Sequence, residues 1–368
     1  MDGMGVKSLM VAGGGTGGHI YPAIAIAREY VARDASRRVV FVGTEKGLEK
    51  NIVPKAGFPL EFISVGGLKG KGGMDLVRNV GRLPLGFLQA WKVVGKHRPD
   101  VVLGVGGYSS GPVLLAAALR GIPTIVHEAN AFPGLTNRLL ARFVRAVAVA
   151  FPEALPRMKR PDGVVTGNPI RKEFFDKGSI APAPVADRKQ RLLVFGGSQG
   201  SRVINDAMTG SLLFLARLKE RLSIVHQTGP NELEKVRAAY RMSAFPDARV
   251  VPYLDPIVDE LAAADVVVCR AGAMTIGELS AIGRAAILIP FAAATNNHQE
   301  LNARVVEKAG GAVVITETEL SPERLGLTIA EIVNDSDRAR RMGQASRTLA
   351  TPAATQKIVD YIEKIQRK

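Results

Sequence analysis

Cysteine is nearly absent from this chain: Cys269 is the only one among 368 residues. A single cysteine excludes an internal disulfide framework and a metal-binding Cys-x-x-Cys pair. Aromatic residues are also scarce, at 5% of the chain, and no apolar run reaches the ~18 residues that a membrane span requires. The first residues do not resemble a signal peptide, because Asp2 precedes a short apolar run that leads directly into glycines. We therefore expect a globular cytoplasmic protein with a reduced thiol.

Acidic residues are too few to balance the basic ones, since 49 Lys and Arg stand against 34 Asp and Glu. Most of the excess lies in the first half, where residues 1–171 carry 23 basic and 11 acidic side chains. Such an asymmetry suggests that this half faces a polyanion or an anionic membrane surface. Charge spread over an open surface for solubility explains the same numbers equally well. Charge alone therefore leaves the partner open.

Short apolar runs rich in β-branched residues recur along the chain and are separated by helical patterns. Uncharged strands that alternate with helices are typical of parallel sheets covered on both faces. The pattern restarts at Arg191–Gly200, after a Pro/Ala-rich stretch at Ser179–Ala186 that is typical of a linker. We therefore expect two tandem α/β units with a ligand cleft between them. The expected strands are Ser8–Ala12, Val39–Val42, Val101–Val105, Thr124–His127, Val144–Ala150, Leu192–Phe195, Ile224–Gln227, Val266–Cys269 and Ala286–Pro290.

Three glycine-rich loops follow expected strands, at residues 13–18, 104–111 and 196–200. Glycine lets the backbone approach a ligand closely, and the N-terminus of the next helix offers free N–H groups. The loops therefore predict binding of a phosphate or diphosphate. None ends in the Gly-Lys-Ser/Thr of P-loop ATPases. The first loop matches the dinucleotide fingerprint, but no acidic residue ends the second strand, so a nicotinamide cofactor is the poorer interpretation.

Two polar positions at strand ends are candidates for catalysis. His19 directly follows the first glycine loop, and an imidazole with its ordinary pKa of ~6.5 is suited to act as a base near neutral pH. Glu128 ends another expected strand, two residues before Asn130. It is suited to be a general base or a hydroxyl acceptor, and the sequence fits a buried strand-end network equally well. For His19 the structural alternative is a histidine bonded to the backbone.

Two later segments suit a nucleotide sugar. Residues 270–278 combine a strand end, a glycine and a helix start, so amides at Ala273–Thr275 are placed to hold a phosphate and Glu278 to accept from ribose hydroxyls. His298 and Gln299 form an uncharged polar cluster suited to sugar hydroxyls. A capped helix and an ordinary polar loop are the structural alternatives.

Residues 69–98 combine basic side chains with an apolar stripe at helical spacing. Such a segment suits an anionic bilayer surface, and a core helix with solvated lysines is the alternative. The residues expected to face a membrane are Lys69, Lys71, Leu76, Val80, Arg82, Leu83, Phe87 and Trp91.

Seven motifs occur in a fixed order: GGGTGGHIYPAIAIA, GVGGYSSGP, HEANAFPGLTNRLL, TGNPIR, GGSQGSRVIN, CRAGAMTIGEL and HQELNA. Together they resemble the MurG family, bacterial enzymes that add N-acetylglucosamine to the lipid-linked muramyl-pentapeptide of cell-wall synthesis. The resemblance runs from about Leu9 into the tail. Seven ordered motifs are far more specific than any single glycine loop.

The resemblance implies an α/β protein of the GT-B type, with two Rossmann-like, doubly wound parallel-sheet domains facing across a cleft. Residues 1–171 and 352–368 would form a domain for the acceptor and the membrane, and residues 172–351 the UDP-sugar domain. Carried over by motif, the residues that would bind UDP-N-acetylglucosamine are Thr16, Gly17, Gly18, Asn130, Arg171, Ser198, Leu254, Ala273, Met274, Thr275, Ile276, Gly277, Glu278 and Gln299.

The implied reaction is an inverting transfer of N-acetylglucosamine to the C4 hydroxyl of the muramyl sugar, which converts lipid I to lipid II. His19 is our first candidate for the base and Glu128 the second. No Asp-x-Asp pair lies beside a donor loop, so we expect helix N-termini, Arg171 and loop amides to stabilise the leaving diphosphate without a metal or other cofactor.

The partners implied by the resemblance are UDP-N-acetylglucosamine, the undecaprenyl-diphosphate-linked acceptor and an anionic membrane surface, but no nucleic acid. The protein would then lie peripherally at the cytoplasmic face of the plasma membrane. Two rivals remain: a UDP-N-acetylglucosamine 2-epimerase, which would need no membrane surface, and a non-catalytic polyanion-binding protein. Three glycine loops argue against the polyanion-binding protein, because binding driven by charge does not require them.

Overall fold

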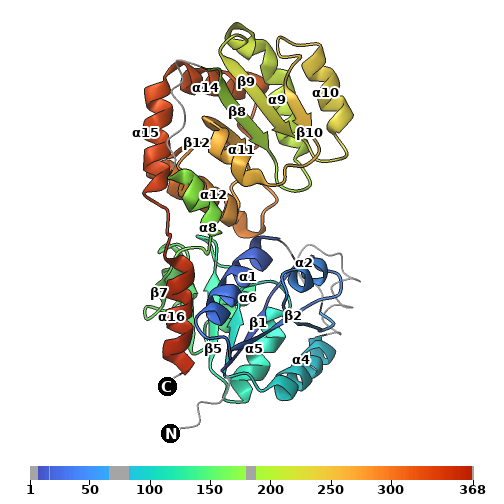
Figure 1. Cartoon of the computed structure of the whole chain (residues 1–368), viewed down its shortest axis with the longest axis vertical. Helices are drawn as coiled ribbons and strands as arrows, with labels where there is room; N and C mark the ends of the chain where they lie inside the picture. Colours follow the sequence, from blue (N-terminus) through green and yellow to red (C-terminus); the bar gives the residue numbers. More distant parts are fainter. Residues whose placement is uncertain (1–6, 16, 66–82, 180–187, 367–368) are drawn as a thin grey trace. The chain divides into compact units, whose positions relative to one another are not determined.

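The structure is a computed structural model that describes residues 7–15, 17–65, 83–179 and 188–366, without the side chains of Leu83 and Thr295. The chain forms two compact units (Figure 1). Unit 1 consists of Met1–Ile170 and Thr351–Lys368, and unit 2 of Arg171–Ala350. Both boundaries lie one residue before those expected from the sequence.

Unit 1 contains a seven-stranded parallel sheet of order β3-β2-β1-β4-β5-β6-β7. In the centre, Leu9 of β1 pairs with Val39 of β2 on one side and with Val101 of β4 on the other. The strand order reverses between β1 and β4, and α/β sheets bind ligands at such a switch point. The strands are β1 (Ser8–Ala12), β2 (Arg38–Gly43), β3 (Leu60–Phe62), β4 (Val101–Gly104), β5 (Thr124–Glu128), β6 (Ala146–Val149) and β7 (Val164–Val165).

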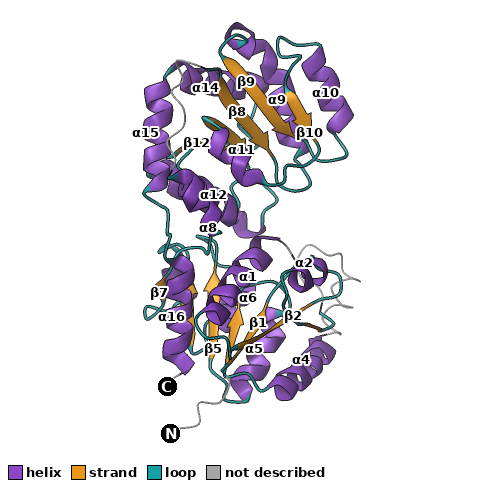
Figure 2. Cartoon of the chain, in the orientation of Figure 1, coloured by secondary structure: helices purple, strands orange, loops and turns teal. Residues whose placement is uncertain are grey.

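Helices cover both faces of this sheet (Figure 2). Neighbouring strand residues such as Leu9 and Met10 enter opposite cores, as the two-residue period of a strand requires. One face is covered by α1 (Gly17–Ala32), α2 (Glu49–Lys55) and α16 (Ala354–Gln366). The other is covered by α4 (Leu83–His97), α5 (Ser110–Leu119), α6 (Leu135–Leu140) and α7 (Ala154–Met158).

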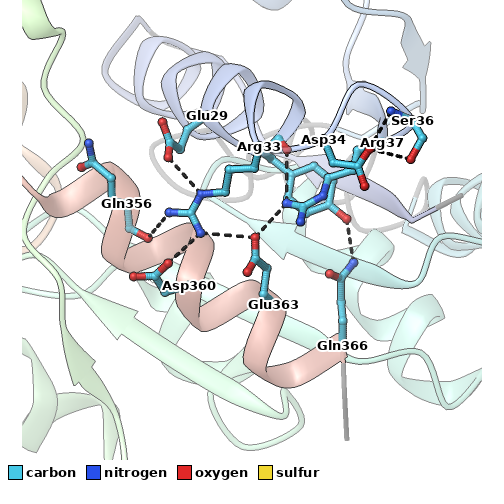
Figure 3. A network of polar contacts seen from close by, with 10 residues as sticks. Glu29, Arg33, Asp34, Ser36, Arg37, Gln356, Asp360, Glu363 and Gln366 are labelled. Atoms are coloured by element: carbon cyan, nitrogen blue, oxygen red, sulfur yellow. Dashed lines mark hydrogen bonds and ion pairs between the residues drawn. The ribbon is translucent and has the colours of Figure 1, made fainter. Parts of the chain in front are cut away.

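The last helix of the chain, α16, is fixed to α1 by apolar contacts and by the polar contacts drawn in Figure 3. Ile362 is fully buried in the core that α16 shares with α1. At the edge of this core, Arg33 Nη1 lies 2.6 Å from Asp360 Oδ1. Glu363 Oε1 lies 3.2 Å from the same nitrogen and 2.8 Å from Arg37 Nη1. Glu363 therefore bridges two arginines at the end of α1.

Unit 2 contains a six-stranded parallel sheet of order β10-β9-β8-β11-β12-β13. Its switch point lies between β8 and β11, where Val266 pairs with Leu192. The strands are β8 (Gln190–Phe195), β9 (Leu222–Gln227), β10 (Arg249–Val251), β11 (Val266–Cys269), β12 (Ala285–Leu288) and β13 (Ala312–Val314). The helices are α8 (Lys172–Gly178), α9 (Arg202–Leu215), α10 (Leu233–Arg241), α11 (Ile257–Ala263), α12 (Ala273–Ile282), α13 (His298–Lys308), α14 (Pro322–Asn334) and α15 (Ser336–Arg347).

All nine strands expected from the sequence are present, within two residues at each end. Four further strands, β3, β7, β10 and β13, were not expected, and each lies at an edge of its sheet. The expected linker at Ser179–Ala186, most of which lies outside the described residues, does not join the units. It connects α8 to β8, and α8 already packs against α11 and α12 of unit 2. None of the described helices is long and apolar enough to cross a membrane.

Candidate functional site

The loops after β1 and β4 pack directly against each other at the carboxyl edge of the first sheet. Gly107 has a φ of +86°, and a Cβ there would lie 2.6 Å from the carbonyl oxygen of Gly14. The buried Ser110 donates its hydroxyl to the carbonyl oxygens of Ala12, at 2.7 Å, and Gly106, at 2.9 Å. The glycines are therefore needed for this close packing, in addition to any role in binding a ligand.

Glu49, for which the sequence predicts no role, holds the first glycine loop in place. Its carboxylate is 1% exposed and accepts hydrogen bonds from the N–H of Gly15, at 2.8 Å, and from the N–H and hydroxyl of Thr44, at 2.8 and 3.0 Å. A Cβ on Gly14, Gly43 or Gly47 would collide with this carboxylate. The three glycines come together around Glu49 only in the folded chain, so this role could not be predicted from the sequence.

His19 lies in the first turn of α1, half-buried, with its ring against the second glycine loop. A Cβ on Gly106 would lie 2.9 Å from the imidazole Cε1. Gly17 and Gly18 begin the same helix, and Gly18 is exposed. Thr16 lies outside the described residues.

Glu128, our second candidate for the base, has both carboxylate oxygens engaged. It is 3% exposed. Oε1 accepts from the N–H and the side-chain amide of Asn130, at 3.0 and 3.1 Å. Oε2 accepts from the N–H of Gly134, at 3.0 Å, and from the amide of Asn137, at 2.8 Å. These four hydrogen bonds fix the loop that follows β5. They form the buried strand-end network that the sequence offered as the alternative to a catalytic role for Glu128.

His127, one residue earlier, is a buried structural histidine. It is 1% exposed, and its Nε2 lies 3.1 Å from the carbonyl oxygen of Gly167. A carbonyl only accepts, so Nε2 carries the proton. Burial lowers the pKa of His127, opposed by the hydrogen bond to the carbonyl of Gly167 and by the negative charge of Glu128. Because its pKa lies below the ordinary 6.5, His127 is neutral at pH 7.

In unit 2, the third glycine loop follows β8 at the switch point. Gly197 has a φ of +97°, and its carbonyl oxygen accepts from Gln227 Nε2 at 2.6 Å. Ser198 is exposed at the tip of this loop. A Cβ on Gly200 would lie 1.9 Å from the carbonyl oxygen of Thr228. As in unit 1, two loops at the carboxyl edge of the sheet pack backbone against backbone.

Arg270 joins three loops at this edge, a role that the sequence does not predict. Its Nη2 donates to the hydroxyl of Ser201 at 2.8 Å, and its Nη1 lies 3.2 Å from the carbonyl oxygens of Ile289 and Pro290. The same Nη1 pairs with Glu317 at 2.6 Å. Because these contacts use the spread of a planar guanidinium, lysine is a poor substitute at this position.

Helix α12 begins at the same edge with an open N-terminus. Its N-cap is Gly272, and no side chain caps the first turn. The N–H groups of the first turn therefore point outward as an anion site would require. Met274, Thr275 and Gly277 are partly exposed. Ala273, at 7% exposure, and Ile276, at 2%, are buried, so they can offer only backbone to a ligand.

Glu278, one turn into α12, pairs with Arg171 at the start of α8. Arg171 Nη2 lies 3.8 Å from Glu278 Oε1, and Arg171 Nη1 lies 2.8 Å from Glu173. Burial raises the pKa of the Glu278 carboxyl to about 7, opposed by Arg171 and helped by the negative charge of Glu173. Near neutral pH this carboxyl is therefore poised between its two protonation states.

Two more residues expected to bind the sugar donor are Gln299, in the first turn of α13, and Leu254, in the loop after β10. Gln299 Oε1 accepts from the N–H groups of Ala271, at 3.3 Å, and Phe291, at 3.0 Å. The buried Asn302, part of a motif but not singled out, donates to the carbonyl of Ala271 at 3.3 Å. Leu254 follows β10 and is buried, at 4% exposure. Within the described residues, no group of three or more His, Cys, Asp or Glu is arranged to hold a metal ion.

The segment expected to face a membrane is described from residue 83 onward. Lys69, Lys71, Leu76, Val80 and Arg82 lie outside the described residues, and Leu83 begins α4.

The structure corrects the exposed face of α4. Phe87 packs against the core of unit 1, so the expected stripe turns inward at this point. The exposed apolar residues are Leu85, at 50%, Leu88, at 62%, and Trp91, at 37%. The guanidinium of Arg120 lies 4.0 Å from the ring centroid of Trp91.

Comparison with known proteins agrees with this arrangement. Residues 9–149 match the glycosyltransferase family 28 N-terminal domain, and residues 191–363 match the glycosyltransferase family 28 C-terminal domain. The UDP-N-acetylglucosamine--N-acetylmuramyl-(pentapeptide) pyrophosphoryl-undecaprenol N-acetylglucosamine transferase of Myxococcus xanthus is 46% identical, over 96% of this chain and 92% of its own.

Solved structures give the same result. MurG of Acinetobacter baumannii aligns with a TM-score of 0.81 and 29% identity, over 97% of this chain and 99% of its own. A putative UDP-N-acetylglucosamine 2-epimerase of Listeria monocytogenes aligns with a TM-score of 0.69 over 98% of this chain and 96% of its own. At 15% identity, this similarity concerns the fold alone. The chain therefore belongs to glycosyltransferase family 28, with the GT-B fold, and within that family to the MurG transferases.

Proposed function

We propose that the protein transfers N-acetylglucosamine from UDP-N-acetylglucosamine to the C4 hydroxyl of N-acetylmuramyl-pentapeptide carried on undecaprenyl diphosphate. This step converts lipid I to lipid II in peptidoglycan synthesis. The observation that carries the proposal is the 46% identity to the Myxococcus xanthus transferase over 96% of the chain. That match extends over both sheets and the loops at their carboxyl edges.

Unit 2 is the proposed donor-binding unit. The uncapped N–H groups of Ala273 to Thr275 and the hydroxyl of Ser198 hold the diphosphate. Arg171 is 41% exposed and contributes a positive charge, exchanging its exposed partner Glu173 for the diphosphate. Charge that develops on the leaving UDP is then stabilised by groups already in place, without a metal ion.

The nucleoside and sugar are held by the remaining donor residues of unit 2. Glu278 accepts from the ribose hydroxyls. Gln299, whose Oε1 is bonded to two loop amides, turns its Nε2 to the sugar hydroxyls. The backbone at Leu254 and Met274–Gly277 lines the site for uracil and ribose.

Unit 1 is the proposed acceptor unit and supplies the base. The C4 oxygen of the muramyl sugar attacks the anomeric carbon as the bond from that carbon to the UDP oxygen breaks. The configuration inverts, UDP leaves with the bonding electron pair, and the acceptor proton passes to His19. Glu128 acts as a positioning residue that holds Asn130 toward the transferred sugar. Thr16, Gly17 and Gly18 complete the loop beside His19.

We also propose that unit 1 binds peripherally to anionic lipid at the cytoplasmic face of the plasma membrane. Leu85, Leu88 and Trp91 are exposed on α4, and Lys92 and Arg120 lie on the same helical layer. Apolar side chains among cations suit this surface. Binding to vesicles containing phosphatidylglycerol should weaken with salt and with Leu88→Ser. Binding that is insensitive to both contradicts this part of the proposal.

Transfer of labelled sugar from UDP-N-acetylglucosamine into the lipid acceptor tests the reaction. We expect a lipid-linked disaccharide, with activity retained in EDTA. Under single turnover, His19→Ala should lower the rate by ~10²–10⁴, the usual effect of removing a base. Near-full turnover in that variant would show that His19 is not the base. Formation of the 2-epimer without any acceptor would favour the epimerase, and tight nucleic-acid binding without uridine preference would favour the polyanion-binding protein.

A further inference from the structure

The outward side of α6 presents apolar side chains in a row. Leu135 is 55% exposed, Leu139 51% and Phe143 63%. They follow at intervals of four residues along α6 and the helical turn that continues it. The inward side of the same segment is also apolar, because Leu140 and Val144 are buried in the core. A helix at a water-exposed surface normally carries polar residues outward, so this face is suited to an apolar ligand.

Positive charge without a carboxylate partner surrounds this row. The guanidinium carbons of Arg138 and Arg157 lie 5.3 and 5.2 Å from the ring centroid of the same residue, Phe132. Within the described residues, Arg138, Arg142 and Arg157 form no ion pair, and the buried Nε of Arg138 has no hydrogen-bond acceptor. Two cations on one ring repel each other. An anion bound near both would weaken that repulsion.

The row of side chains starts at the candidate site. Gly134 and Asn137, at the beginning of α6, are both bonded to Glu128 Oε2. That carboxylate ends β5 at the carboxyl edge of the sheet, and its Oε1 holds Asn130. A ligand whose head occupies the acceptor site can therefore continue along α6. Arginine and apolar side chains alternate along this path, so it can hold both an anionic group and a hydrocarbon chain.

We propose that Leu135, Arg138, Leu139, Arg142 and Phe143, the α6 track, bind the acceptor lipid itself: the arginines its diphosphate and the apolar row its first isoprene units. The inference rests on the proposed function, because only an acceptor on a polyprenyl diphosphate has this form. The bilayer surface shares the chemistry, but the direct link from Glu128 to α6 favours a substrate that is held in the site.

Kinetics in detergent micelles, with acceptors whose diphosphate carries either a short methyl tail without isoprene units or a long polyprenyl tail, test the proposal. The double variant Leu135→Ser, Leu139→Ser should raise KM for the long-tailed acceptor about ten-fold, as expected for lost apolar contact. KM for the short-tailed acceptor and for UDP-N-acetylglucosamine should not change. The matched control Leu213→Ser, Leu327→Ser removes two exposed leucines, 79% and 49% exposed, from unit 2 and should change none of the three.

An equal rise for both tails, or no rise, would overturn the proposal. So would loss of vesicle binding by the α6 variant with unchanged kinetics in detergent, since the track would then be a bilayer contact. Binding of undecaprenyl diphosphate, which has no sugar, separates this inference from the proposed function. If the wild type binds it and the α6 variant does not, the track stands even where no sugar is transferred. Equal binding by both proteins rejects the track whatever the activity.

Discussion

The N–H of Gly15 donates a 2.8 Å hydrogen bond to the carboxylate of Glu49, 34 residues further along the chain. The first glycine loop is thus held in shape from α2, a helix that carries none of the expected ligand-binding residues. The same carboxylate holds Thr44 at the end of β2. Two adjacent strand ends are thereby coupled through one buried charge, and the backbone amides of the loop are fixed before any ligand binds.

Replacement of Glu49 should therefore reduce both stability and activity. In Glu49→Gln an NH2 group replaces one of the two carboxylate oxygens, so at least one N–H of the loop loses its acceptor. A buried donor without an acceptor costs about 1–3 kcal/mol of folding stability. We expect this loss in urea unfolding followed by the fluorescence of Trp91, which is the only tryptophan and lies in unit 1. The turnover rate should fall as well, since the loop beside His19 loses its support. Glu45→Gln, at an exposed position in the same region, is the control and should behave as wild type.

Donor binding should depend on pH through Glu278. The pKa of this carboxyl is raised to about 7, and ribose hydroxyls donate to its ionised form. Affinity for UDP-N-acetylglucosamine, measured by calorimetry, should therefore rise as the pH increases towards 7 and level off above it. Below pH 7 the affinity should change by up to about ten-fold per pH unit. The sugar-blocked diphosphate does not titrate in this range. Glu278→Gln should bind more weakly at pH 8 and show no such dependence.

The same shift has the opposite effect on the stability of the unliganded protein. The pKa of Glu278 is higher in the folded state than the ordinary 4.5. Its protonation therefore stabilises the fold fully below pH 4.5, and this contribution is lost as the pH rises from 4.5 to about 7.

The substitution Glu173→Gln removes a negative charge that raises the pKa of Glu278. In this variant the midpoint of the pH dependence of UDP-N-acetylglucosamine affinity should move to lower pH. A midpoint that stays in place would show that Glu173 does not influence this carboxyl.

The interior of the fold could be predicted from the sequence, and its edges could not. The nine expected strands are the ones with uncharged runs of at least four residues, because central parallel strands are buried on both faces. The four missed strands are two or three residues long, and β7 is exposed at both positions. With one pairing partner and few buried side chains, an edge strand needs no apolar run. Its position is set by the neighbouring strand instead.

The candidate site shows the same division. Glycine loops and helix starts repeat a local pattern, so their positions could be predicted. The roles of Glu49 and Arg270 could not, because each depends on backbone atoms from loops far apart in the sequence. The sequence also left Glu128 undecided, since a base and a loop anchor are the same residue type at the same strand end. Its four hydrogen-bond donors become apparent only when the loop after β5 is folded.

Variants of Glu128 and His19 should therefore differ in kind. Glu128→Ala leaves the amide of Asn137 and the N–H of Gly134 without their acceptor, so unfolding of unit 1 should cost about 2–4 kcal/mol less. Turnover should fall while the pH profile of kcat keeps its shape. His19→Gln should leave stability nearly unchanged and remove the acidic limb of the profile. A profile that lost this limb in Glu128→Ala instead would make Glu128 the base.

The attachment of α16 to α1 should depend on pH through Glu363. Burial alone would raise the pKa of this carboxyl, but hydrogen bonds from Arg37 and Arg33 outweigh it and lower the pKa overall. A carboxyl with a lowered pKa stabilises the fold above its ordinary range, and this contribution is lost as the pH falls through the folded-state value. Glu363→Gln should therefore lower the stability of unit 1 by about 1 kcal/mol at pH 7, because partly buried pairs exceed the usual surface value.

Urea unfolding followed at Trp91 measures this difference between wild type and Glu363→Gln as a function of pH. The difference should shrink toward zero in acid, where wild-type Glu363 becomes neutral like glutamine. Asp247→Asn changes an exposed acid in unit 2 and should leave the Trp91 transition unchanged at every pH. If Glu363→Gln were as stable as wild type at pH 7, the apolar side chains around Ile362 would be sufficient to hold α16, and the ion pairs with Arg33 and Arg37 would add nothing measurable.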